Sequence, residues 1–316
     1  MTKEIKPDYL YMNGKITPWN EATVHIWSEV AIRGANVFDS IRAYWNPSTA
    51  SYNLLALDEH IERLLESARL LKIPNLPSLD EIKEGVIELL HTLDFREHTF
   101  IRPTIYIESG RYGRLPEETE VGYYIVAFPT PHSNELFTGI KCCVSSWRRS
   151  NELTISPRIK AGSSYMALRL PKIEAIEGGY DDAILLNDQG TVSEATGATL
   201  FIVKKDKIIT PPVHAGILES ITREKLMLLL LEEMGYQVIE REIARTELYS
   251  AQEVFLCGTL SEVQPVINID GYTIGSGAVG NITSMLQKRF LNICELEESP
   301  PQGWLTKIST KSTQEE

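Results

Sequence analysis

The chain has 316 residues and a mass of 35.6 kDa, more than a single hydrophobic core usually serves, so two domains are expected. Hydrophobic residues make up 43% of the chain and charged residues 23%, a balance that excludes disordered and collagen-like proteins. The formal net charge of −12 argues against broad binding of nucleic acids or anionic membranes, because both require a positive surface.

The first part of the chain alternates strand and helix patterns. Asn13-Gly14 predicts the turn of an opening hairpin. Asp58 is expected to cap a helix with apolar residues at 3.6-residue spacing, and Ser78 with Glu81 forms a capping-box pattern that opens a second helix. Strands are expected at 9–12, 15–17, 37–44, 51–57, 100–108 and 122–128. This order of elements predicts a small α/β domain over 1–129.

Residues 130–139 contain proline and turn-forming residues without periodicity, which is typical of a linker. A larger domain is expected over 140–300, followed by a tail at 301–316 whose last ten residues are frayed. Helices are predicted at 164–177, 222–234, 247–251 and 282–293, and Pro171 should kink or break the first of them. Strands are expected at 140–147, 182–186, 198–204, 208–210, 237–242 and 253–257, with a hairpin turn at 270–271.

Neither a membrane span nor a disulfide framework is predicted. The most apolar run, 226–231, is far shorter than the ~20 residues that a bilayer requires, and the N-terminus lacks the apolar core of a signal peptide. The four cysteines form no metal-binding pair, and the six histidines have no metal-ligand spacing. We therefore expect a cytoplasmic protein without a metal site.

Three segments are ambiguous when each is taken alone. The GSGAVG sequence at 275–280 matches a dinucleotide pattern, but no βαβ unit follows it, so a glycine turn before the last helix is favoured. The helix entry at 216–224 is either an anion site or an ordinary N-cap. Lys160 is either a side chain that reaches solvent or an amine made nucleophilic by burial.

The same segments gain meaning from their order along the chain. From about Tyr9 to about Phe290, the sequence resembles the class IV (fold type IV) pyridoxal-phosphate enzymes, and within them the branched-chain amino acid aminotransferases. The motifs that carry the resemblance are VFDSIRAY (37–44), EHIERLLESA (59–68), IRP (101–103), SSW (145–147), KAGSSY (160–165), VSEATGATLF (192–201), ILESITRE (217–224) and EVFLCGTLSEVQPV (253–266).

The resemblance implies a mixed α+β fold, with a small N-terminal α/β domain and a larger C-terminal domain containing a pseudo-barrel of strands. It also implies pyridoxal 5′-phosphate as cofactor. Lys160 would form the Schiff base and move the proton between substrate and cofactor, while Glu194 would keep the ring nitrogen protonated. The remaining contacts implied for the cofactor are Arg63, Tyr165, Ser220, Ile221, Thr222 and Thr259.

Substrate contacts are implied for Arg33, Phe38, Ser40, Arg42, Phe100, Arg102, Thr259 and Leu260. Arg102 would bind a second carboxylate when glutamate is the amino donor. The family commonly has a tyrosine where this chain has Arg33, and GTAAE where it has GTLSE. Arg33 therefore either meets an unusual substrate or forms an ion pair with Asp39 or Glu29.

The function implied is amino transfer, most often between a branched-chain L-amino acid and 2-oxoglutarate, by a ping-pong Schiff-base mechanism. The alternatives are a D-amino acid or (R)-amine transaminase, an aminodeoxychorismate-type lyase, and a non-catalytic binding protein. The family also implies at least a homodimer, with Leu115 and the loop 110–114 reaching the neighbouring subunit.

Overall fold

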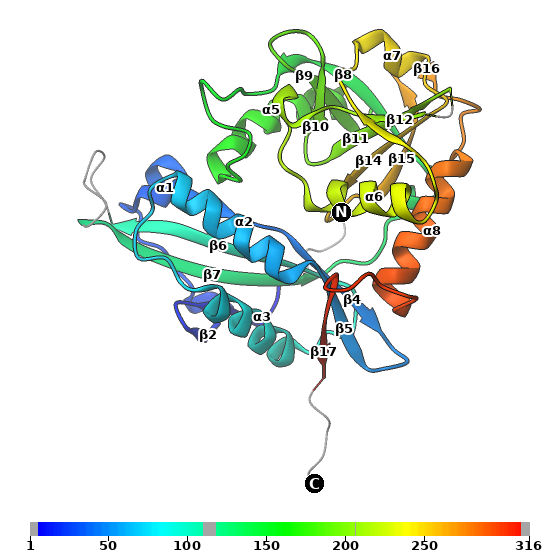
Figure 1. The fold of residues 1–316 in the computed structure, drawn as a ribbon. Coiled ribbons are helices and arrows are strands. Elements are labelled where there is room, and N and C mark those ends of the chain that lie inside the picture. The colour runs from blue at the N-terminus through cyan, green and yellow to red at the C-terminus, as the bar shows by residue number, and fades with distance from the viewer. Residues whose placement is uncertain (1–5, 110–117, 206, 311–316) are drawn as a thin grey trace. The chain divides into compact units, whose positions relative to one another are not determined.

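A computed structural model describes residues 6–109, 118–205 and 207–310, and it shows two compact units (Figure 1). Unit 1 comprises Met1–Pro131, Ile159–Ser163 and Asn292–Glu316, and unit 2 comprises His132–Arg158 and Ser164–Leu291. The domain limits expected from the sequence stay a prediction. Leu115 and the loop 110–114 lie outside the described residues.

Unit 1 is built on an eight-stranded sheet in the order β17-β5-β4-β6-β7-β1-β2, with β3 paired to β6. The strands are β1 Tyr9–Met12, β2 Lys15–Pro18, β3 Asn36–Phe38, β4 Ile41–Asn46, β5 Ser51–Leu55, β6 Thr99–Ser109, β7 Glu120–Pro129 and β17 Leu305–Ser309. Every neighbouring pair on this path is antiparallel. The turn at Asn13-Gly14 and the hairpin around it are confirmed.

The helices of unit 1 cover this sheet. They are α1 Glu29–Arg33, α2 Leu57–Leu70 and α3 Leu79–Leu93, with a short 3₁₀ turn at Trp19–Glu21. Figure 1 shows α2 and α3 along β6 and β7. Ile61 and Leu64 of α2 share a fully buried core with Ile101 and Ile105 of β6.

The two predicted caps of these helices have different outcomes. The capping box of Ser78 and Glu81 is present at the start of α3, so this prediction is confirmed. The prediction that Asp58 caps α2 is wrong, because Ala56 adopts a left-handed conformation (φ 52°) and the helix begins one residue before Asp58. The Ala56 N–H donates to the Trp304 carbonyl at 2.7 Å, which holds the chain in this turn.

The strand predicted at 37–44 is broken at Asp39-Ser40. The Asp39 N–H donates to the Pro103 carbonyl at 3.0 Å, and its carboxylate turns into the core of unit 1. This break separates β3 from β4. A second difference is β17, which pairs with β5 from Leu305↔Leu55 to Ser309↔Ser51 where a frayed tail was expected.

Unit 2 is built on a nine-stranded sheet in the order β10-β9-β8-β15-β14-β11-β12-β13, with β16 paired to β15. The strands are β8 Ile140–Arg148, β9 Asp182–Leu186, β10 Val192–Ala195, β11 Thr199–Lys204, β12 Lys207–Thr210, β13 Val238–Glu240, β14 Glu253–Gly258, β15 Glu262–Ile269 and β16 Tyr272–Thr273. A bridge between Thr191 and Ala244 joins the β10 edge to the chain just beyond β13. The sheet therefore curls toward closure, as the predicted pseudo-barrel requires.

The helices in and around unit 2 are α4 Glu135–Thr138, α5 Gly162–Glu177, α6 Ile221–Glu232, α7 Arg245–Tyr249 and α8 Asn281–Leu296, with a 3₁₀ turn at Val213–Ala215. Of the kink or break predicted at Pro171, the break is wrong, because α5 continues through this residue. Pro171 is buried together with Leu168 and Ala175, three residues before it and four after it, so its ring belongs to the packed side of the helix.

The glycine-rich sequence before α8 is a turn whose helix end is already capped. Glu253 of β14 accepts hydrogen bonds from the N–H groups of Ile282 and Thr283, at 3.0 and 2.8 Å. A side-chain carboxylate therefore occupies the place where a dinucleotide phosphate would bind, which supports the structural interpretation of this sequence. None of the helices among the described residues has the length and apolarity to cross a bilayer.

Glu247→Gln is expected to lower the free energy of unfolding near neutral pH by about 1 kcal/mol, because it removes a bidentate bond with Arg241. The hydrogen bond from Arg241 lowers the pKa of Glu247 from 4.5 to about 2. A carboxylate with a depressed pKa stabilises the fold above its unfolded pKa, and this contribution is lost as the pH falls toward 2.

Urea unfolding of the wild type and Glu247→Gln at about pH 7 and about pH 3 tests this linkage. The stability difference should shrink at the lower pH. A difference that stays constant between the two conditions would contradict the role given to the Arg241–Glu247 pair.

Candidate active site

Lys160 lies in the short segment Ile159–Ser163 of unit 1 and is only 7% exposed. Its carbonyl accepts a hydrogen bond from the Phe38 N–H at 3.0 Å, and its own N–H donates to Ser67 Oγ at 3.2 Å. The chain of this segment also bridges β3, at Val37↔Ala161. The interpretation of Lys160 as a solvated side chain is therefore wrong, because the sheet and α2 hold it in a buried position.

Two cationic groups of unit 1 lie near the Phe38 ring. The Arg102 guanidinium carbon lies 3.7 Å from the ring centroid, and Lys160 Nζ lies 5.2 Å from it. Both distances are in the range of cation–π attraction. Unit 1 thus brings together three of the predicted residues: an amine, an aromatic ring and a guanidinium.

Arg63, the residue predicted to hold a phosphate, binds the carboxylate of Asp39. Its Nε and Nη2 atoms each donate to Asp39, at 2.8 Å. Arg33 forms an ion pair with Glu29, at 2.8 Å. Of the two ion pairs considered for Arg33, the pair with Glu29 is therefore present.

The remaining predicted residues of unit 1 are Ser40, next to Asp39, Arg42 on β4 and Phe100 on β6. The Ser40 N–H donates to Asp39 Oδ1 at 2.7 Å. Arg42 is 2% exposed and donates from Nη2 to the Thr130 carbonyl at 2.9 Å. Phe100 is the cross-strand partner of Arg42 between β6 and β4, so these two residues occupy one register position.

Glu194, predicted to face a ring nitrogen, is held by two donors of unit 2. Arg149 Nε donates to its Oε1 at 2.7 Å, and the Leu218 N–H donates to its Oε2 at 3.2 Å. Arg149 and Glu194 are 7% and 5% exposed, so they form a buried ion pair. The sequence analysis missed Arg149, because it lies 45 residues before Glu194 and no local pattern connects the two.

The N-terminus of α6 carries the donors expected of an anion site. Ser220 is the N-cap, and its Oγ accepts a hydrogen bond from the Arg223 N–H at 3.2 Å. Among the described residues, the N–H groups of Ile221 and Thr222 meet no acceptor, as is usual in a first helical turn. Both an N-cap and two available N–H donors are therefore present at this helix entry.

The turn between β14 and β15 approaches the chain that follows Glu194. A Cβ added at Gly258 would lie 3.4 Å from the Gly197 carbonyl oxygen, which is ordinary van der Waals contact, so the two backbone segments lie close together. Thr259 is half-buried and Leu260 is 49% exposed in the turn. The turn therefore lies beside the chain that follows Glu194, and the Glu194 carboxylate accepts the Leu218 N–H.

Tyr165 lies near the start of α5 and is half-buried.

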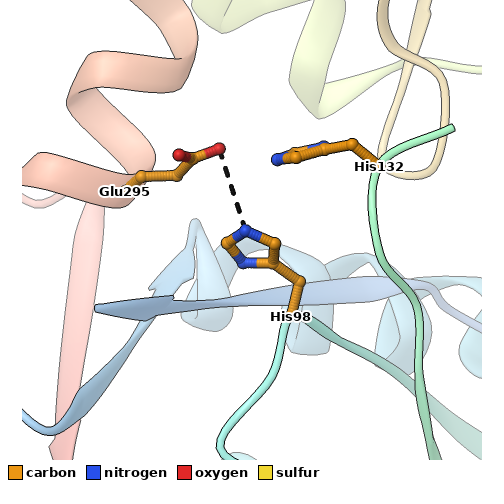
Figure 2. Close-up of side chains that lie close together, drawn as sticks. All are labelled: His98, His132 and Glu295. Carbon is orange, nitrogen blue, oxygen red and sulfur yellow. Dashed lines mark ion pairs between the residues drawn. The ribbon is translucent and has the colours of Figure 1, made fainter. Parts of the chain in front are cut away.

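In unit 1, His98 and Glu295 form a further ion pair, with Nε2 and Oε1 3.9 Å apart (Figure 2). His98 Nδ1 accepts a hydrogen bond from the Trp45 N–H at 3.0 Å, which directs Nε2 toward the carboxylate. This pair joins the start of β6 to the end of α8.

Comparison with known proteins identifies the family. The model of the amino-transferase class IV family matches residues 36–269. The chain belongs to the class IV aminotransferases. It is a pyridoxal-phosphate-dependent transaminase with the fold of type IV.

Three relatives show how closely the chain follows this family. It is 40% identical over 313 residues to a probable branched-chain-amino-acid aminotransferase of Aquifex aeolicus, covering 98% of this chain and all of the relative. The branched-chain aminotransferase of Thermobaculum terrenum, solved in its pyridoxal-phosphate form, has 37% identity and a TM-score of 0.90, with 96% and 98% of the two chains covered. The branched-chain aminotransferase of T.th., complexed with N-(5′-phosphopyridoxyl)-L-glutamate, has 30% identity and a TM-score of 0.89, covering 96% and 99%.

Proposed function

We propose that this aminotransferase moves an amino group between a branched-chain L-amino acid and 2-oxoglutarate. The relatives from Aquifex aeolicus and Thermobaculum terrenum are named for branched-chain amino acids and match nearly the whole chain. The T.th. relative binds a glutamate conjugate of the cofactor, which supports glutamate and its oxo acid as the second pair. The observation that carries the proposal is the buried Lys160 amine beside Phe38 and Arg102, in a chain of this family.

The residues of the chain fit the cofactor chemically. When bound, pyridoxal phosphate supplies an aldehyde that takes up the amino group and a ring that accepts the electron pair of the substrate carbon. Lys160 offers the amine, Glu194 a carboxylate anion for the ring nitrogen, and the N-terminus of α6 offers backbone donors for the phosphate. Tyr165 would donate to the ring hydroxyl, and the remaining proposed phosphate contacts are Arg63, Ser220, Ile221, Thr222 and Thr259.

Each of these groups has a distinct part in the reaction. Lys160 would carry a proton between the substrate α-carbon and the cofactor, as a general acid and base. Glu194 would hold a proton at the ring nitrogen, and the hydrogen bond from Arg149 fixes the position of its carboxylate. The burial of Lys160 and Glu194 strengthens these electrostatic effects by excluding water.

The substrate side of the site combines apolar and cationic groups. Phe38, Phe100 and Leu260 would contact a branched aliphatic side chain. Arg102 would bind the second carboxylate when glutamate is the donor, while its stacking on Phe38 keeps the guanidinium in place. The other proposed substrate contacts are Arg33, Ser40, Arg42 and Thr259.

A screen of amino donors tests the substrate. The purified holoenzyme would be mixed with L-leucine, L-valine, L-isoleucine, D-alanine or an (R)-amine, each with 2-oxoglutarate as acceptor. L-glutamate would be tested with the oxo acid of leucine as acceptor, and the formation of each product would be followed. We expect activity with the branched-chain L-amino acids and with L-glutamate. Faster turnover of the D-amino acid or the amine, or release of pyruvate from a lyase substrate, would overturn the proposal; the relatives do not favour these alternatives.

We also propose that the enzyme works as a homodimer in the cytoplasm. The family resemblance supports the dimer, because one subunit there completes the site of the other. Four buried cysteines, none of them in a disulfide, are consistent with a reducing compartment. Sedimentation equilibrium of the holoenzyme measures the assembly, and a monomer with full activity would contradict the dimer.

A further inference from the structure

The Asp39 carboxylate is the centre of a buried cluster in unit 1. It is fully buried in the turn between β3 and β4. His60 Nδ1 lies 2.8 Å from its Oδ1, and Arg63 binds both of its oxygens through Nε and Nη2. His60 and Arg63 lie three residues apart on α2, so one face of the helix presents both groups to the same carboxylate.

The charges in this cluster follow from its burial. Burial would raise the pKa of Asp39, but the Arg63 guanidinium and His60 outweigh it and hold that pKa well below its usual range. Burial also lowers the pKa of His60, against the opposing effect of Asp39. Asp39 is therefore an anion, His60 is a neutral imidazole that donates from Nδ1, and Arg63 is a cation.

Asp39 binds the Arg63 guanidinium along one edge and thereby sets its orientation. The edge that carries Nε and Nη2 faces Asp39, so the Nη1 donors point away from the carboxylate. The side chain of Arg63 is 12% exposed, whereas that of Asp39 is fully buried. The guanidinium is consequently held at one angle by a partner that cannot move into solvent.

We propose that Asp39 and His60 are positioning residues for the cofactor phosphate: they orient Arg63 and thereby set the affinity of the site for phosphate. This inference rests on the proposed role of Arg63 as a phosphate contact. Asp39 acts on Arg63 directly, and His60 acts on Asp39 by fixing the carboxylate that Arg63 binds.

Charge and orientation predict opposite effects of removing the Asp39 carboxylate. Asp39 offsets the charge of Arg63, so its removal would tighten phosphate binding if charge alone mattered. If orientation dominates, Asp39→Asn weakens binding, because the amide cannot accept both bonds from the guanidinium and the side chain of Arg63 gains rotational freedom. We expect the second outcome, with affinity lowered about tenfold.

The experiment measures binding to the apoprotein, so that it does not depend on activity. The dissociation constants of inorganic phosphate, pyridoxal 5′-phosphate and pyridoxal are determined by calorimetry for the wild type, Asp39→Asn, Asp39→Glu, His60→Leu and Arg63→Met. Asp39→Asn and His60→Leu should weaken phosphate and pyridoxal 5′-phosphate, but should leave pyridoxal nearly unchanged. Asp39→Glu keeps the carboxylate and should recover most of the affinity.

A matched control is available on the same helix. Asp58→Asn makes the same chemical change in the exposed pair of Asp58 with Lys83, whose Nζ–Oδ1 distance is 2.7 Å, and should leave phosphate affinity unchanged. Thermal unfolding of each variant shows whether it folds. If Asp39→Asn does not fold, His60→Leu carries the test, because it keeps the Asp39–Arg63 ion pair.

The outcomes distinguish a failure of Arg63 as a phosphate contact from a failure of the positioning role of Asp39 and His60. If Arg63→Met binds phosphate as the wild type does, Arg63 is not a phosphate contact and that part of the proposed function fails. If Arg63→Met loses affinity while Asp39→Asn and His60→Leu keep or increase it, the positioning role is overturned. An equal loss of pyridoxal and pyridoxal 5′-phosphate in the Asp39 and His60 variants would also overturn it, because a positioning effect on Arg63 acts through the phosphate.

Discussion

Replacing Lys160 with alanine is expected to lower the rate of transamination by about 10⁴-fold or more, because the change removes the amine that carries the proton. Lys160 is buried, and hydrogen bonds with the Phe38 N–H and Ser67 Oγ fix its backbone, so a neighbouring group would have to move to replace the amine. Single-turnover mixing with L-leucine, followed by the visible absorption of the cofactor, measures this step apart from product release.

The control for this change is Lys83→Ala, which removes a partly exposed lysine of the same unit that pairs with Asp58. It should react at the wild-type rate. Added methylamine should restore part of the rate of Lys160→Ala, because a small amine can enter the space left by the side chain and transfer the proton. Full activity of Lys160→Ala without an added amine would refute the role of Lys160.

Arg149→Met should have the second largest effect, on both stability and activity. The change leaves the Glu194 carboxylate buried without its cation, which typically costs about 3–5 kcal/mol. Glu194 would also lose the donor that fixes the position of its carboxylate. A displaced carboxylate would stabilise a proton at the ring nitrogen less well, and we expect kcat to fall about 100-fold.

Urea unfolding of the apoprotein and the nitrogen-15 chemical shift of a labelled cofactor ring measure these two effects separately. Arg158→Met serves as the matched control, because Arg158 is exposed and forms its ion pairs with Glu152 and Glu219 at the surface. It should change stability by less than about 1 kcal/mol. A ring nitrogen that stays protonated in Arg149→Met would show that Glu194 stabilises that proton without Arg149.

Features encoded within a few residues could be predicted from the sequence. Asn13-Gly14 makes a turn because both residues tolerate positive φ, and Ser78 with Glu81 satisfies the first N–H groups of α3. The Lys160 motif was also recognisable, because its neighbours in the chain are part of the family pattern. These features need no knowledge of what lies far away in the sequence.

Long-range pairs account for what the sequence did not reveal. The bond of Arg149 to Glu194 joins the end of β8 to β10, and the break at Asp39 depends on the Pro103 carbonyl of β6. Each partner alone looks like an ordinary surface charge or strand residue. Only the sheet topology brings them together, and single-sequence periodicity carries no information about it.

The same limit applies to the ambiguous side chains. The sequence offered Asp39 and Glu29 as ion-pair partners of Arg33, and the structure shows the pair with Glu29, at 2.8 Å and one helical turn away. A charged residue in a motif therefore predicts that a partner exists more reliably than it predicts which one.

The pairing of β17 with β5 also affects how the protein is made. Strand β5 ends at Leu55, but its neighbour at the sheet edge is Leu305–Ser309, about 250 residues later in synthesis. The ribosome adds about 5–20 residues per second, so one backbone edge of β5 stays unpaired for more than about ten seconds. We expect the nascent N-terminal half to depend on chaperones during that interval, and a truncation before Trp304 to leave an edge that aggregates.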